Sequence, residues 1–286
     1  MEEVSIIIPA YNENEGIGRV IESLRLLREK HGQQWEIIVV DDGSTDGTPG
    51  MVRNFNDVIL IQHPSNRGYG AAIKTGIRHA KYNTLVISDA DGTYPIQDIP
   101  KLIAQLPKSD MVVGARCSNS SNIPLSRRPA KWVLNKLANY LTGIIIPDLN
   151  SGLRVMKKDI VLKYLHLLPD GFSFTTTITL AMLTNNYLVE FIPIDYKIRS
   201  GRSKIRPIRD TMNFIQLIIR TVLYFDPLKI FLPISVLFFI SSIAVLVLSY
   251  LFTQKVMDIT TVILFISGVQ ILAIGMIADL IDKRNR

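Results

Sequence analysis

The residues of this sequence best suited to chemistry are two aspartates separated by one residue, Asp89 and Asp91, in the segment DADGTYP. Two carboxylates with this spacing, where a strand gives way to a loop, can bind one divalent cation that keeps open positions for the oxygens of a diphosphate. The segment also fits a simpler structure, an Asx turn or the N-cap of a helix that begins near Pro95. The pair alone leaves both interpretations open.

A second acidic pair, Asp41 and Asp42, begins the segment DDGSTDGT, for which an Asp-Gly turn is the simpler interpretation. Both pairs come directly after apolar runs, WEIIVV at 35–40 and TLVIS at 84–88. In an α/β sheet the carboxyl ends of parallel strands meet at one edge, and ligands bind beyond that edge. The joint placement of the two pairs therefore favours a functional site.

The elements that would position these aspartates alternate between short apolar runs and amphipathic stretches. The runs predict strands at 4–8, 35–40, 58–61, 84–88 and 110–114, and the stretches predict helices at 16–30, 69–81, 95–106 and 129–142, with a short helix after the second strand. Near-continuously apolar strands separated by helices are typical of a parallel sheet covered on both faces. We therefore predict a Rossmann-like, mostly parallel α/β fold.

Several other kinds of site are disfavoured by the sequence. The segment 68–75 (GYGAAIKT) imitates a nucleotide-triphosphate loop, but Ile73 stands where the second glycine is required. The four histidines lack the spacing of zinc ligands, and Cys117 is the only cysteine, so no internal disulfide can form.

Two uncharged apolar runs near the C-terminus, 230–252 and 259–278, predict two transmembrane helices. At 1.5 Å per residue they span about 35 and 30 Å, which matches the hydrocarbon core of a bilayer. The short connection makes the pair a hairpin, so both chain ends lie on one side. The basic residues that flank the hairpin place that side in the cytoplasm by the positive-inside rule. The N-terminus is acidic and its apolar run is short, so we expect no signal peptide.

The net charge of +7 is concentrated in one segment. Residues 1–196 carry 20 basic and 20 acidic residues, whereas 197–210 carry six basic residues and one acid. A basic segment next to a predicted membrane span indicates an anionic lipid or phosphate partner, and we expect no nucleic-acid binding. Within this segment we expect Arg206 and Arg209 mainly to anchor, and we expect residues 212–225 to form an interfacial amphipathic helix.

Longer motifs resemble a known family. The segments PAYNENEGI (9–17), VVDDGSTDGT (39–48), NRGYGAAIKTGIRHA (66–80) and DADGTYP (89–95) resemble the family 2 glycosyltransferases of GT-A fold. The segments NSGLRVMKKD (150–159) and YKIRSGRSK (196–204), with the hydrophobic hairpin, resemble the polyisoprenyl-phosphate branch, which includes dolichyl-phosphate mannose synthases and bacterial undecaprenyl-phosphate glucosyltransferases.

The resemblance implies roles for the residues that match these motifs. Asp89 and Asp91 would hold Mg²⁺ or Mn²⁺, and they would act with Arg116 and Arg128 as the catalytic set. The nucleotide sugar would be bound by Pro9, Ala10, Tyr11, Asn12, Glu13, Val40, Asp41, Asp42, Ala90, Asp91, Thr93, Arg199 and Lys204. The acceptor phosphate would be bound by Asp148, Asn150, Ser151, Arg154, Arg202 and Ser203, although an Asp-Leu-Asn-Ser-Gly turn at 148–152 remains an equal alternative.

The implied reaction moves a hexose from a nucleotide sugar of GDP-mannose or UDP-glucose type to a polyprenyl or dolichyl monophosphate, with inversion. A phosphate monoester has a second pKa of about 6, so the acceptor is already an anionic nucleophile and needs no general base. Mannose synthases tend to have Gln where this chain has Thr93, which leaves the sugar open.

The resulting organisation is a cytoplasmic GT-A domain at 1–206, a juxtamembrane helix at 207–227, spans at 228–252 and 259–280, and a cytoplasmic basic tail at 281–286. The hairpin is also a surface through which a homo-oligomer could form. Two alternatives are a polysaccharide synthase, which would carry a Gln-x-x-Arg-Trp motif that this chain lacks, and a non-catalytic membrane scaffold, which would not need both Asp89 and Asp91.

Overall fold

The computed structural model describes residues 3–31, 34–116, 136, 138–140, 142–196, 227–253 and 258–284. The chain divides into two compact units, Met1–Ile215 and Gln216–Arg286, and each is described by itself.

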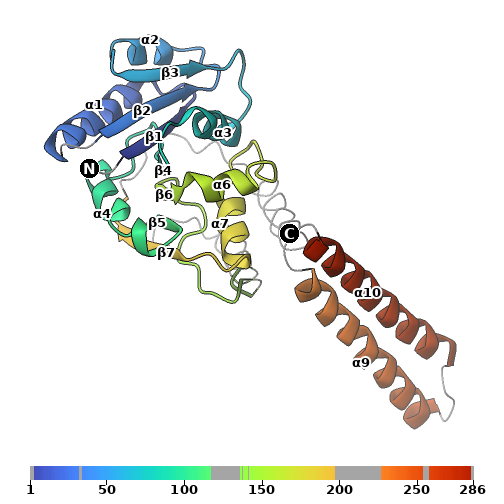
Figure 1. Cartoon of the computed structure of the whole chain (residues 1–286). Helices are drawn as coiled ribbons and strands as arrows, with labels where there is room; N and C mark the ends of the chain where they lie inside the picture. Colours follow the sequence, from blue (N-terminus) through green and yellow to red (C-terminus); the bar gives the residue numbers. More distant parts are fainter. Residues whose placement is uncertain are drawn as a thin grey trace. The chain divides into compact units, whose positions relative to one another are not determined.

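A seven-stranded sheet forms the centre of the described part of the first unit (Figure 1). Its strands are β1 (Glu3–Ala10), β2 (Gln34–Asp41), β3 (Val58–Gln62), β4 (Thr84–Ile87), β5 (Met111–Arg116), β6 (Arg154–Lys157) and β7 (Val189–Ile194). The strand order is β3-β2-β1-β4-β6-β5-β7, and only β6 among these runs antiparallel to its neighbours. The predicted mostly parallel sheet is confirmed.

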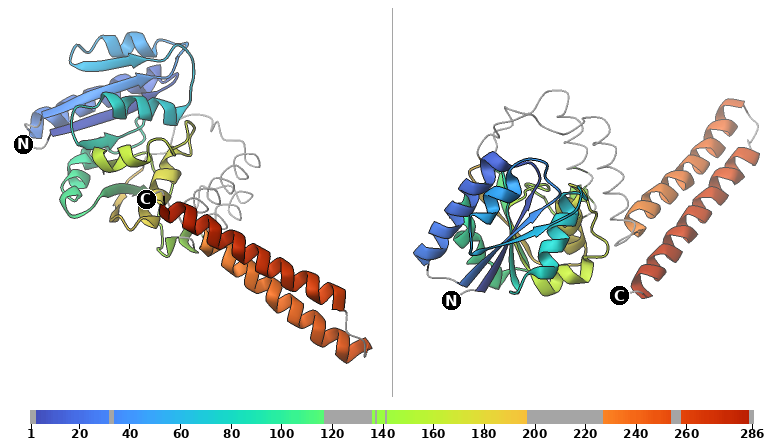
Figure 2. Two further views of the ribbon diagram at one scale, coloured as in Figure 1. Left: turned by 45° about the vertical axis from the view of Figure 1, so that its right-hand side comes forward. Right: turned by 90° about the horizontal axis from the view of Figure 1, so that it is seen from above.

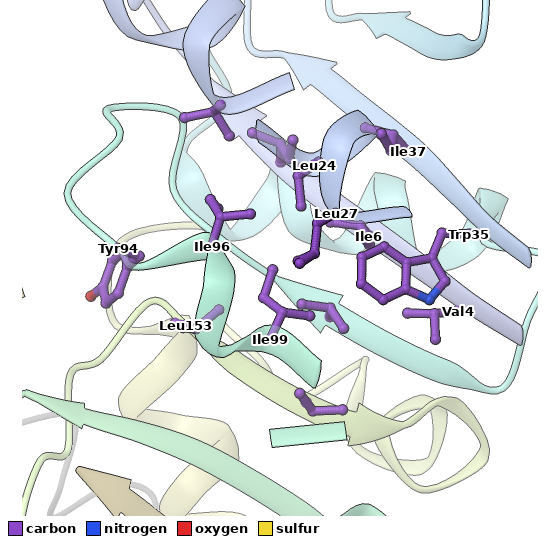
Figure 3. Packing of buried hydrophobic residues seen from close by; sticks show 14 of the residues in the cluster. Val4, Ile6, Leu24, Leu27, Trp35, Ile37, Tyr94, Ile96, Ile99 and Leu153 are labelled. Carbon is purple, nitrogen blue, oxygen red and sulfur yellow. The ribbon is translucent and has the colours of Figure 1, made fainter. Parts of the chain in front are cut away.

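Helices cover both faces of this sheet (Figure 2). On one face lie α1 (Asn14–His31), the 3-10 turn η1 (Ile96–Asp98) and α4 (Ile99–Ile103), whose apolar residues pack with those of β1 and β2 (Figure 3). On the other face lie α3 (Tyr69–His79), α6 (Lys158–Tyr164) and α7 (Phe174–Thr184). The short helix α2 (Thr48–Arg53) follows β2 as expected. Strands buried between two helical layers explain why their sequences are apolar throughout.

Three parts of this unit differ from the sequence-based expectations. The helix expected at 95–106 is interrupted, because Pro100 lies in the first turn of the short helix α4 and Pro107 lies in a second 3-10 turn, η2 (Leu106–Lys108). The strands β6 and β7 were not predicted: β6 has only four residues, and Pro193 lies within β7. The helices expected at 129–142 and 207–227 fall mostly outside the described residues, although Lys136 and residues 138–140 are helical.

The described residues of the second unit form a hairpin of two long helices, α9 (Leu228–Thr253) and α10 (Asp258–Arg284). The helices are joined by two hydrogen bonds that the hydroxyl groups of Ser235 and Ser242 donate, both at 2.9 Å, to the carbonyl oxygens of Gly268 and Thr261. Segments Leu228–Phe252 and Ile259–Ile281 are long and apolar enough to cross a membrane, and most of their side chains are exposed in the hairpin. Helices that are apolar on every side are typical of a lipid environment.

Candidate active site

The loops that follow β1, β2 and β4, together with the segment before β6, carry most of the described candidate residues. The paired register of β1 with β2 and of β1 with β4 places their carboxyl ends at one edge of the sheet. The backbone of Gly16 in α1 approaches this edge closely, since a Cβ atom there would lie 2.7 Å from the carbonyl oxygen of Ala90. The acidic segments at the ends of β2 and β4 therefore lie at the same edge of the sheet, on the two strands that flank β1, as the sequence predicts.

Hydrogen bonds fix the loop after β1 to the loop after β2. The amide of Asn12 donates to Ser44 Oγ at 2.9 Å, and the amide of Thr45 donates back to Asn12 Oδ1 at 2.9 Å. Asn12 adopts a left-handed conformation with φ 53°, which asparagine tolerates better than most residues. The amide of Glu13 donates to Thr48 Oγ1 at 3.0 Å. Tyr11, Asn12 and Glu13 thus lie partly exposed on a loop that is hydrogen-bonded to the segment after β2.

The carboxylates of Asp41 and Asp42 are buried and bond to the protein itself. Asp42 accepts hydrogen bonds from the amides of Arg67 and Gly68 at 2.9 and 2.8 Å, and it lies 2.7 Å from His63 Nδ1. Asp41 accepts a hydrogen bond from the amide of Ser44 at 3.3 Å. These contacts connect the ends of β2 and β3 to the N-terminus of α3, so both side chains build the edge of the site.

Asp89 lies partly exposed directly beyond β4, between two residues that fix its position. Its Oδ1 accepts a hydrogen bond from the hydroxyl of Tyr69 at 2.8 Å. Burial of that hydroxyl and the charge of Asp89 raise the pKa of Tyr69 well above its usual value, so the hydroxyl stays protonated and donates. On the other side lies Gly152, where a Cβ atom would come within 2.7 Å of both carboxylate oxygens of Asp89.

Asp91, two residues further on, is also partly exposed and sits in a tight turn with Thr93. Its Oδ1 accepts hydrogen bonds from the amide and the hydroxyl of Thr93, at 3.1 and 2.6 Å. The described residues contain no cluster of three or more His, Cys, Asp or Glu side chains arranged to hold a metal ion. Two carboxylates nevertheless fit Mg²⁺ or Mn²⁺, because such ions in phosphate-transfer sites are commonly held by one or two carboxylates, substrate phosphates and water.

An ion pair between Arg116 and Asp148 lies at the end of β5. Arg116 donates from Nε to Asp148 Oδ2 at 2.7 Å and from Nη2 to Asp148 Oδ1 at 2.8 Å, which makes the pair bidentate. Although burial acts in the opposite direction, the hydrogen bonds and the charge of Arg116 lower the pKa of Asp148. Arg116, expected in the catalytic set, and Asp148, expected at the acceptor phosphate, thus bond to each other, and the Arg116 guanidinium also lies 5.4 Å from the ring centroid of Tyr196.

Arg154, expected at the acceptor phosphate, is fully buried in β6. Its guanidinium donates to the carbonyl oxygens of Ser151 and Thr175, at 2.5 and 3.1 Å, and to the hydroxyl of Thr179 at 3.0 Å. Burial lowers the pKa of Arg154 to about 10, which leaves it charged at neutral pH, and the charges of Asp148 and Asp89 act in the opposite direction. Arg154 is therefore a positive charge beneath the site.

The remaining acceptor-side residues near β6 also bond within the protein. Ser151 is buried and donates from Oγ to the carbonyl oxygen of Gly114 at 2.6 Å, and Asn150 Oδ1 accepts a hydrogen bond from Thr176 Oγ1 at 2.5 Å. The turn alternative for 148–152 is supported by the amide of Asn150, which donates to Asp148 Oδ1 at 3.2 Å. Arg128, Arg199, Arg202, Ser203 and Lys204 lie outside the described residues.

Comparison with protein-family models decides the classification. The model described as glycosyl transferase family 2 matches residues 5–165, which contain the whole edge described above. The chain belongs to glycosyltransferase family 2. A second model, the GtrB C-terminal hairpin, matches residues 226–283 of this glycosyltransferase, which include α9 and all of α10 except its last residue. Together with the length and apolarity of those helices, this match makes the chain a membrane glycosyltransferase.

Individual relatives agree with this family. The glycosyltransferase is 25% identical to a dodecaprenyl-phosphate galacturonate synthase of Rhizobium johnstonii over 98% of this chain and 88% of the relative. It is 32% identical to an undecaprenyl-phosphate 4-deoxy-4-formamido-L-arabinose transferase of Salmonella paratyphi B, over 56% of this chain and 50% of the relative. That second match therefore spans only half the length of the curated relative.

Solved structures support the GT-A fold of the glycosyltransferase. Glucosyl-3-phosphoglycerate synthase of Mycobacterium tuberculosis, crystallised with Mn²⁺, uridine diphosphate and phosphoglyceric acid, aligns with a TM-score of 0.59 and 19% identity. The alignment covers 77% of this chain and 78% of the other. At this identity the likeness concerns the fold alone.

Sequence reasoning missed three residues that shape the candidate site of this glycosyltransferase. Tyr69 donates a hydrogen bond to Asp89, and Gly152, which has no side chain, leaves room for the Asp89 carboxylate. Tyr94 accepts a hydrogen bond at 2.6 Å from the amide of Gly152. All three lie inside motifs already noted, at 66–80, 89–95 and 150–159, but their contacts join segments far apart in the chain. Only the fold reveals those contacts.

Proposed function

We propose that this protein is a metal-dependent, inverting glycosyltransferase that moves a hexose from a nucleotide sugar to a polyprenyl or dolichyl monophosphate. The observation that carries the proposal is the partly exposed Asp89–Asp91 pair at the carboxyl edge of a family 2 domain whose chain also carries a membrane hairpin. A lipid acceptor explains why one chain carries both a glycosyltransferase domain and a membrane hairpin. The names of the relatives, which are polyprenyl-phosphate sugar transferases, support this acceptor class.

In the proposed reaction an oxygen of the lipid phosphate attacks the anomeric carbon while the bond from that carbon to the diphosphate breaks. The nucleoside diphosphate leaves with the bonding electrons, and the configuration inverts. A divalent cation, when bound, neutralises charge on the departing diphosphate. Asp89 and Asp91 are the residues that would hold it.

The other described residues have positioning roles in this proposal. The loop of Tyr11, Asn12 and Glu13 lies beside the aspartates and would contact the nucleotide. Arg116 can offer its guanidinium to a phosphate at the cost of part of its pairing with Asp148, because planar guanidinium groups bind phosphate and carboxylate in the same bidentate way. The buried charge of Arg154 acts from beneath on Asp89 and Asp148. No general base is needed, since the acceptor phosphate is already anionic.

The proposal includes the membrane arrangement and the finer domain limits. The catalytic domain and both chain ends would lie in the cytoplasm, because the basic residues flanking the hairpin favour that side. Arg128, Arg199, Arg202, Ser203 and Lys204 would complete the binding of the two phosphate-bearing substrates.

A transfer assay tests the proposed function. The purified full-length protein is incubated in nanodiscs with polyprenyl phosphate, Mg²⁺ or Mn²⁺, and radiolabelled nucleotide sugars supplied one at a time. We expect label in a lipid-extractable product with one donor, and none without the acceptor or with EDTA. Label in a polymer would favour the polysaccharide synthase, and no transfer from any common nucleotide sugar would contradict the proposal.

A further inference from the structure

A cavity of about 270 Å³ lies along α3, and no carboxylate of the candidate active site lines it. It is lined by Arg67, Ala71, Lys74, Thr75, Arg78, Leu165, His166 and Asp170. The first five residues come from α3 and the segment before it, and the other three from the connection between α6 and α7. We call this cavity the α3 groove; it contains none of the side chains assigned above to substrates or metal.

The α3 groove has an excess of positive charge. Three cationic side chains and one imidazole face a single carboxylate, that of Asp170, which already pairs with Lys74 Nζ at 2.7 Å. Arg67 and Arg78 are exposed, and within the described part of the chain neither has a carboxylate at salt-bridge distance. Residues 1–196 as a whole carry equal numbers of basic and acidic residues, so the excess in the groove is local.

The two walls of the groove are held together by backbone contacts. The amide of Ala71 donates to the carbonyl oxygen of Asp170 at 3.0 Å. A Cβ atom on Gly70 would lie 2.2 Å from the carbonyl oxygen of Pro169, and one on Gly68 would lie 2.4 Å from that of Asp170. Only glycine permits this approach, so the cations of α3 and the imidazole of His166 are presented on a fixed frame.

We propose that the α3 groove binds a phosphate group. Guanidinium groups bind phosphate oxygens bidentately, an ammonium group adds a compact charge, and a histidine ring can donate a hydrogen bond. At about 30 Å³ per water molecule the cavity has room for roughly nine waters, which suffices for a phosphate and part of the group attached to it. The ligand is either the headgroup of an anionic phospholipid or a soluble phosphate, and both present the same chemistry.

The bound phosphate would connect α3 to the α6–α7 connection across the groove. Local opening of both walls should then become rarer, and the amides of residues 67–79 and 163–171 should exchange hydrogen more slowly. The same helix carries Tyr69, which donates to Asp89, so the groove lies on an element of the candidate active site. The binding itself does not depend on the proposed reaction.

Hydrogen–deuterium exchange of the full-length protein in nanodiscs tests this proposal, with EDTA present to exclude metal-bound phosphate. In one arm, phosphatidylcholine nanodiscs are titrated with inorganic phosphate against chloride at equal ionic strength. In the other, phosphatidylcholine nanodiscs are compared with nanodiscs of equal parts phosphatidylcholine and phosphatidylglycerol. Protection of 67–79 and 163–171 in the first arm identifies soluble phosphate as a ligand, and protection in the second identifies the headgroup.

Variants show whether the groove causes the protection. Each basic side chain near an anionic group raises the binding affinity about fivefold, so the double variant Lys74→Ala with Arg78→Ala should bind the phosphate group about 30-fold more weakly. Arg78→Ala alone, which keeps the Lys74–Asp170 pair, should bind it about fivefold more weakly. The matched control, Lys101→Ala with Lys108→Ala, removes two exposed cations from the other face of the sheet and should retain full protection. Absence of protection in both arms, or equal protection in the groove variants, would overturn the proposal.

Discussion

The two acidic pairs at the carboxyl edge of the sheet have the same residue types and opposite surroundings. Asp41 and Asp42 are at most 3% exposed, and their carboxylates accept hydrogen bonds from neighbouring loops. Asp89 and Asp91 are partly exposed, and the described bonds come from Tyr69 and Thr93. Identical residue types at one edge of the sheet thus have two different roles. The pair at the end of β2, Asp41 and Asp42, stabilises the loops of the edge, and the pair after β4, Asp89 and Asp91, presents carboxylate oxygens to ligands; we call these the β2 pair and the β4 pair.

This difference follows from the segments that surround each pair. The carboxylate of Asp42, directly after β2, accepts hydrogen bonds from the amides of Arg67 and Gly68, which lie between β3 and α3. After β4 the chain passes between α1 and β6, where close contacts at Gly16 and Gly152 leave little room for side chains other than those of the aspartates. Hydrogen bonds within the protein therefore satisfy the buried carboxylates of Asp41 and Asp42, whereas the carboxylates of Asp89 and Asp91 remain accessible to ligands.

The sharpest test of the comparison is Asp91→Asn. If the β4 pair holds a divalent cation, this change removes a charged ligand, and sugar transfer should fall about 10³-fold, equivalent to the several kcal/mol that a Lewis-acid metal supplies. The circular dichroism spectrum and the unfolding midpoint should stay close to those of the wild type. Transfer at an unchanged rate would exclude Asp91 from the metal site.

The opposite result is expected for Asp42→Ala. This change leaves two backbone amides and His63 without their buried acceptor, so the free energy of unfolding should fall by about 3 kcal/mol or more. Urea titration followed by tryptophan fluorescence measures the loss. The affinity for Mn²⁺, measured by electron paramagnetic resonance well below the unfolding midpoint, should remain that of the wild type. A fully stable variant that only binds nucleotide more weakly would show that Asp42 is a ligand residue after all.

The sequence contains enough information for the sheet and for the edge at which the site lies. Long apolar runs at β1, β2 and β5 are visible because each strand is buried on both faces. The roles of individual polar residues are not visible, because they depend on partners far along the chain. Arg116 pairs with Asp148, and Arg154 turns inward to Thr175 and Thr179. The motifs predicted substrate contacts for Arg116, Asp148 and Arg154, and they predicted no role for the two threonines.

Gly152→Ala tests the space in which Asp89 lies. The added Cβ atom would come within 2.7 Å of both carboxylate oxygens, so Asp89 must move. Displacing a metal ligand through its neighbour typically costs 10- to 100-fold in affinity, and we expect about that loss for Mn²⁺. Gly50→Ala is the matched control, because a Cβ atom there has no neighbour within 4 Å. Unchanged Mn²⁺ affinity in Gly152→Ala would mean that Asp89 does not contribute to the metal site.

The smallest effect is expected for Tyr69→Phe, which removes one hydroxyl and keeps the ring that stacks on Phe172 at 5.5 Å. Loss of the hydrogen bond to Asp89 Oδ1 should weaken Mn²⁺ binding about tenfold, at the lower end of the effect of outer-shell partners. Because burial and Asp89 raise the pKa of Tyr69, the hydroxyl keeps its proton up to alkaline pH, so the pH profiles of variant and wild type should be parallel between neutral and mildly alkaline pH. Tyr187→Phe, which changes a tyrosine outside the site, should behave as the wild type. If Tyr69→Phe lowered stability but left Mn²⁺ affinity intact, Tyr69 would be a structural residue of the edge, as Asp42 is. The difference in function between the two acidic pairs would then involve the aspartates alone and not their hydrogen-bond partners.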